Sequence, residues 1–204
     1  MGELALIEKN NYHVVIGKIC SMNSSVTQQE ENRQWFVMRD LTRSNAKLPA
    51  YKMLKEKNIK FFTPMELKVV VRNGIRKREK VPFMHDLIFV FDTREVLDPI
   101  VARIDTFQYR YLRHTNRIPM TVRKEDMERF ICAVESVESP HYYTMEEITP
   151  EMHKRKIRII GGRLDGFEGY LLTVRGSKVK RLLVELPTLL AASVEVESEY
   201  IQLI

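Results

Sequence analysis

The sequence PFMHDLIFVF at residues 82–91 ends in five consecutive apolar side chains, Leu87–Phe91. Such a run predicts a strand covered on both faces, or a strand that keeps one face for a partner. Leu87 and Phe89 share one face, because alternate side chains of a strand point the same way. They are therefore either core residues or part of an exposed docking patch.

The segments before this strand predict a strand, a helix and a hairpin. Trp35–Met38 is rich in strand formers, and apolar residues then recur at helical spacing over Leu48–Asn58. Ile59–Val71 is predicted as one extended strand. Asn73-Gly74 suits a two-residue hairpin turn, and the return strand is expected at Ile75–Val81.

Positive charge is concentrated in this part of the chain. Residues 35–104 hold 15 Lys and Arg against 8 Asp and Glu, whereas the whole chain has a net charge of +6. The charge is compatible with a polyanionic partner but does not identify one. The basic side chains near the hairpin turn are either solvated or in contact with such a partner: Arg72, Arg76, Lys77, Arg78 and Lys80.

The segments after the apolar strand predict two more helices and one strand. Thr93 is suited to cap a helix that extends to Ile104, although Pro99 must lie near its start or distort it. Tyr109–Arg113 is predicted as a strand, and a last helix is expected at Lys124–Val134. An apolar stripe is predicted on this helix, formed by Met127, Phe130, Ile131 and Val134. This order of elements predicts an α+β domain, with helices packed on an antiparallel or mixed sheet, over residues 35–138.

The remaining residues divide into three parts. Residues 1–34 are expected to be an N-terminal extension, and residues 139–155, with two prolines and no sustained periodicity, a linker. Residues 156–204 show five short alternating runs separated by glycine and proline turns. About fifty residues in such runs predict a small all-β barrel that closes its sheet edges.

The sequence offers no pattern typical of an enzyme or a metal site. Cys20 and Cys132 lie far apart and lack zinc-type spacing, and no nucleophile motif is present. Gly161-Gly162 is not followed by a helix that could bind phosphate, and the isolated His85 is expected to be structural or to contact a partner. Without a membrane-length apolar segment or a secretory signal, we expect a cytoplasmic protein without metal, cofactor or membrane partner.

Two stretches resemble known families. Residues 156–169, KIRIIGGRLDGFEG, resemble the KOW motif of small SH3-like barrels. Trp35, Phe61-Phe-Thr-Pro64, the Asn73-Gly74 hairpin and the stretch 82–90 resemble the NusG N-terminal (NGN) domain in order and spacing. The resemblance covers residues 35–204 and implies an NGN α/β sandwich, at residues 35–138, followed by a KOW barrel. It further implies a transcription factor that binds the clamp helices of RNA polymerase.

Four shorter stretches are similar to the UpxY subgroup of the NusG family. They are MRDL at 38–41, NAKLPAY at 45–51, ESVESPHYY at 135–143 and RGSKVKRLLVELP at 175–187. The subgroup antiterminates transcription of capsular polysaccharide operons and is held in check by small companion proteins. One departure stands out: Met84-His-Asp-Leu87 occupies the place of the general Phe-Pro-Gly-Tyr, so Leu87 replaces an aromatic contact.

The resemblance also implies residue roles. Met84, Leu87 and Phe89 are expected to form an apolar polymerase-binding patch, and four glycines are expected in the KOW turns: Gly161, Gly162, Gly166 and Gly169. Basic residues on or before the first helix match places where a specialised relative touches non-template DNA, or else they form a solvated face: Arg43, Lys47, Lys52 and Lys55. The rival interpretation is a KOW-type module that binds RNA or the ribosome.

Overall fold

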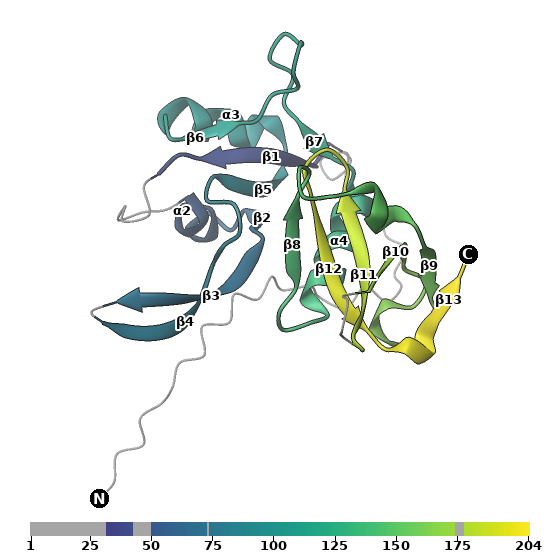
Figure 1. Cartoon of the computed structure of the whole chain (residues 1–204). Helices are drawn as coiled ribbons and strands as arrows, with labels where there is room; N and C mark the ends of the chain where they lie inside the picture. The colour runs from purple at the N-terminus through teal and green to yellow at the C-terminus, as the bar shows by residue number, and fades with distance from the viewer. Residues whose placement is uncertain (1–31, 43–49, 73, 174–177) are drawn as a thin grey trace, which may run out of the picture.

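The computed structural model describes residues 32–42, 50–72, 74–173 and 178–204. Within these residues the chain forms two β-sheets, a separate two-stranded hairpin, and a helix α4 (Lys124–Glu135) that packs against both sheets. Figure 1 shows the first sheet and the hairpin at the left and the second sheet at the right. The extension, residues 1–34, lies outside the described residues apart from its last three positions.

The first sheet is antiparallel and is built around two interior strands. β1 (Gln34–Asp40) pairs with β5 (Leu87–Asp92), and β2 (Lys60–Phe62) pairs with the other edge of β5. β6 (Phe107–Tyr109) and β7 (Thr121–Val122) pair with the remaining edge of β1. The apolar run is thus an interior strand. The strand predicted at 109–113 is observed earlier in the chain, as β6, which ends at Tyr109.

Helices cover both faces of this sheet. α2 (Ala50–Glu56) and α3 (Arg94–Arg103) share a core with Ile88 and Val90. α4 shares another core with Leu87 and Phe89 on the opposite face. Because both faces are covered, every position of the strand can be apolar, and the first of the two alternatives, a strand covered on both faces, is observed.

The helices begin and end near the predicted residues. The backbone N–H of Ala50 donates to Oδ2 of Asp40 at 3.0 Å, which satisfies one free amide at the start of α2. Asn58, the predicted stop, has a left-handed φ of 54°. α3 begins directly after Thr93, as predicted, but the Thr93 side chain makes no capping hydrogen bond, and Pro99 lies inside the helix.

The long strand predicted at Ile59–Val71 is wrong, because it is two strands in two sheets. β2 ends at Phe62, and β3 (Met65–Arg72) pairs with β4 (Ile75–Pro82) in the hairpin. The break falls at Pro64, whose missing N–H cannot extend a strand ladder. The hairpin itself is confirmed, and Gly74 in its turn has the expected positive φ of 76°.

The second sheet has six strands in an open order, β13-β9-β10-β11-β12-β8. Its strands are β8 (His141–Thr144), β9 (Lys156–Ile159), β10 (Glu168–Thr173), β11 (Lys180–Leu186), β12 (Leu190–Val196) and β13 (Ile201–Leu203). The pairing of the described residues leaves β13 and β8 as edges, so the expected closure into a barrel is not observed. Part of the segment expected as a linker, residues 139–155, is strand β8, which pairs with β12.

Helix α4 joins the two sheets into one apolar core. Its buried side chains face Leu87 and Phe89 of the first sheet and Leu182 and Val194 of the second. The predicted apolar stripe of this helix is confirmed and widened by one residue: Met127, Phe130, Ile131, Ala133 and Val134 are all buried. The two sequence units are therefore packed together in this structure.

Candidate functional surfaces

The predicted polymerase-binding residues lie at the start of β5 and in the turn before it. Leu87 and Phe89 are 2% and 0% exposed, so the expectation that they form an exposed patch is wrong. The ring of Phe89 packs at 6.3 Å, centroid to centroid, from that of Phe62, which in turn meets Phe130 of α4 edge-on. Of the three predicted residues, Met84 alone is half-buried, at the rim of this core.

A carboxylate fixes the turn that carries Met84. Oδ2 of Asp86 accepts hydrogen bonds from Nε of Arg39 at 3.1 Å and from Nη2 of Arg110 at 3.3 Å. Burial raises the pKa of Asp86, but the charges and hydrogen bonds of Arg110 and Arg39 outweigh it, so the pKa lies below its usual value. The departure from the general NusG pattern thus supplies an anchor to the start of β5 and to β1.

The predicted DNA-contacting residues are only partly described. Lys52 and Lys55 lie exposed on α2, whose opposite side is held in the core by Met53 and Leu54. Arg43 and Lys47 lie outside the described residues. The helix therefore presents two lysines to solvent, and their binding role stays a prediction.

The predicted turn glycines of the second unit are needed for two different reasons. Gly161, Gly162 and Gly166 have φ values of 97°, 69° and 77°, which side-chain-bearing residues rarely adopt. Gly169 instead lies in β10, where a Cβ atom would collide with the backbone carbonyl oxygen of Leu183. Their turn and packing roles are structural, and nothing in this geometry assigns them a ligand.

Sequence reasoning missed the contact between the two units. Tyr142 of β8 packs against Phe83 at 5.4 Å and Phe130 at 6.4 Å between ring centroids, which connects the second sheet to the rim beside Met84. A second contact also comes from α4, where the Arg129 guanidinium lies 5.4 Å from the centre of the Phe167 ring and donates to the Glu168 carbonyl. The two adjacent tyrosines in 141–144 were the available signal, because aromatic residues favour strands.

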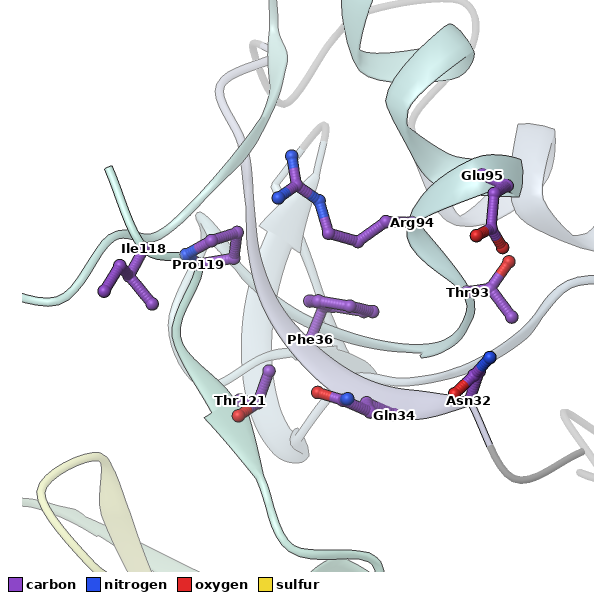
Figure 2. A pocket seen from close by; sticks show the side chains of 9 residues that line it. All are labelled: Asn32, Gln34, Phe36, Thr93, Arg94, Glu95, Ile118, Pro119 and Thr121. Carbon is purple, nitrogen blue, oxygen red and sulfur yellow. The ribbon is translucent and has the colours of Figure 1, made fainter. Parts of the chain in front are cut away.

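An open hollow of about 460 Å³ lies beside β1 and the start of α3 (Figure 2). Figure 2 shows Phe36 at its floor, with Arg94 and Glu95 from α3 and Ile118 and Pro119 from the loop before β7 around it. Its lining contains no nucleophile paired with a base. In the described part of the chain, no cluster of potential metal ligands occurs, and no helix has the length and apolarity needed to cross a bilayer.

The family comparison coincides with the first sheet and its helices. Residues 33–131 match the family model described as "Transcription termination factor nusG". These residues are thus similar to the NusG family, and for that similarity we call them the NusG-family domain. The match begins beside β1 and ends within α4, so the second sheet lies outside it. A search of curated proteins finds no match to the chain.

The match to the NusG family model indicates a role in transcription elongation or termination. NusG proteins are transcription factors that bind RNA polymerase, which supports polymerase as the general partner. The NusG domain also contains the rim at Met84 and the basic helix α2. Both predicted contact regions therefore lie within the matched residues.

Proposed function

We propose that this protein is a transcription antitermination factor that binds the clamp helices of RNA polymerase through its NusG-family domain. The family match over residues 33–131 carries this proposal. The stretches similar to the UpxY subgroup support polysaccharide biosynthesis operons as its targets. In this proposal it acts in the cytoplasm without a cofactor, and a small companion protein binds either unit to restrain it.

Met84 is the residue that we propose contacts the polymerase. It lies at the half-buried rim of an apolar cluster whose deeper members, Leu87 and Phe89, share a core with α4. The Asp86 anchor holds the turn beside it. A half-buried methionine is suited to such a contact, because its flexible side chain adapts to a partner surface.

The exposed lysines of α2 are proposed to contact non-template DNA, together with Arg43 and Lys47. Lys52 and Lys55 lie on a different element from Met84, so one domain can hold polymerase and a DNA strand at once. Contacts to phosphate supply affinity that falls with salt. The KOW motif, in this proposal, marks the second unit as a further interaction module.

The rival function, an RNA- or ribosome-binding module led by the second unit, has less support. Three cations of its strands have carboxylate partners: Lys156 and Arg158 share Glu168, and Arg181 pairs with Glu195. A surface whose cations are already paired attracts a phosphate backbone less strongly. The concentration of positive charge in the NusG domain favours the proposed function.

A polymerase pull-down with the full chain tests the proposal. Met84→Asp places a charge in the proposed docking surface and should abolish retention of core polymerase. Val96→Asp is the matched control, because Val96 is 43% exposed on α3, at the opposite face of the sheet. Equal retention of both variants, with unchanged circular dichroism, would overturn the docking assignment.

A further inference from the structure

The β3–β4 hairpin stands apart from the rest of the fold. Its two strands pair only with each other and form a sheet of their own, which Figure 1 shows extending away from the first sheet. Each strand has eight residues, so the ribbon is about 27 Å long. A long exposed ribbon of this kind is a surface available to a partner.

The strand register sorts the side chains of the hairpin onto two different faces. Directly opposite residues of an antiparallel pair lie on the same face. Leu67 pairs with Lys80, Val69 with Arg78, and Val71 with Arg76. These six residues form what we call the basic face: Leu67, Val69, Val71, Arg76, Arg78 and Lys80.

The basic face is both apolar and positively charged. Its aliphatic side chains are 40%, 61% and 62% exposed at Leu67, Val69 and Val71, and its three cations are exposed as well. The two acids of the hairpin, Glu66 and Glu79, lie on the other face. Among the described residues, none of the three cations of the basic face has a carboxylate partner.

We propose that the basic face binds double-stranded DNA, with the ribbon lying in the major groove. Arg76, Arg78 and Lys80 are alternate residues, so they recur at about 6.8 Å, which is twice the 3.4 Å rise per phosphate of one DNA strand. The major groove, about 12 Å wide, admits a two-stranded ribbon. The cations then follow one phosphate backbone, while Val69 and Val71 meet thymine methyl groups at the base edges.

The same geometry selects DNA over double-stranded RNA. The major groove of A-form RNA is deep and narrow, and side chains cannot read it. The ribbon would be confined to the outside of an RNA helix. There the aliphatic side chains of the basic face would gain no contact with the base edges. The inference does not depend on polymerase binding, because the surface is separate from the rim at Met84.

Salt-dependent binding of the full chain to a 20-bp DNA duplex and to an RNA duplex of matching sequence tests this surface. The pair Arg76→Gln and Arg78→Gln removes two phosphate contacts, so the slope of log affinity against log salt should fall by about 1.8. The ratio of the unmutated chain's DNA affinity to that of the variant should then grow about 3.5-fold each time the salt concentration is halved. Fluorescence anisotropy provides both slopes.

The control variant combines Lys68→Gln with Lys77→Gln, which removes the same charge from the opposite face. It should keep the slope of the unmutated chain, and circular dichroism should show all three proteins folded, because the changed residues are exposed. Equal slope losses in both variants would mean that net charge alone attracts DNA and would overturn the proposal. Equal affinity for the RNA duplex, or no binding of the unmutated chain to DNA, would overturn it too.

Discussion

Strand β5 and strand β3 of the hairpin are near each other in sequence and both are rich in aliphatic residues, yet one is hidden and the other exposed. Phe89 is 0% exposed, whereas Val69 is 61% exposed. The difference arises from what lies on each face: β5 has helices on both sides, and the hairpin has strand partners only within itself. Apolar content therefore predicts a strand, while the neighbouring layers decide whether that strand is core or surface.

The largest expected effect separates the two regions directly. Phe89→Ala removes a fully buried ring that packs against Phe62 and should lower the free energy of unfolding by about 3–5 kcal/mol. Val69→Ala, its counterpart on the hairpin, should change this free energy by about 0.5 kcal/mol or less, because the side chain is exposed. Urea unfolding followed by circular dichroism measures both, and similar losses would contradict the assignment of core and surface.

A substitution in the second sheet extends the comparison to the core that both sheets share. Gly169→Ala forces a Cβ atom against the carbonyl of Leu183, which belongs to a paired strand and cannot move easily. We expect a loss of about 2–3 kcal/mol. Gly166→Ala is the milder partner variant, at about 1 kcal/mol, because its cost is the left-handed backbone alone. Thermal unfolding distinguishes them, and the reverse order would contradict the packing described.

A smaller effect concerns the anchor at the start of β5. The pKa of Asp86 is lowered in the folded chain, so its ion pairs contribute stability above its ordinary pKa of 3.8 that is lost as the pH falls through the folded value. Asp86→Asn should cost about 1 kcal/mol at pH 7. The variant and the unmutated chain should converge in stability below pH 4. A constant difference across pH 3–7 would show that the charge of Asp86 is irrelevant.

The smallest effect on stability is expected on α2. Lys52→Glu with Lys55→Glu alters exposed side chains, so the free energy of unfolding should change by about 0.5 kcal/mol or less. Terminator readthrough should nevertheless fall, because the helix would repel a phosphate backbone while Met84 remains available. Transcription through a terminator placed behind a polysaccharide operon leader measures this, and full readthrough would make the lysines a solvated face.

Local pattern was sufficient to predict most elements of the NusG-family domain. The run at Leu87–Phe91, the stripe of α4 and the turn at Gly74 each depend on a few adjacent residues, and all three are confirmed. The break at Pro64 was also readable, because proline rarely lies inside a paired strand, but the surrounding aliphatic residues concealed it.

Long-range packing was not predictable in the same way. Whether Leu87 and Phe89 are core or docking residues depends on α4, some forty residues later in the chain. The pairing of β8 with β12 depends on segments equally far apart. Family resemblance therefore placed the candidate site at residues 84–89, while the burial of Leu87 and Phe89 could be seen only in the three-dimensional structure.

Site-specific crosslinking tests the central claim, that the rim at Met84 is where polymerase docks, most directly. A photo-crosslinking amino acid replaces Met84 in one full-length protein and Val96 in another, and each is illuminated with core RNA polymerase. Met84 is at the rim of the core beneath α4, and Val96 is exposed on the opposite face of the same sheet. The account predicts crosslinks from position 84 to the polymerase clamp helices and none from position 96. Crosslinks from position 96 alone would contradict it.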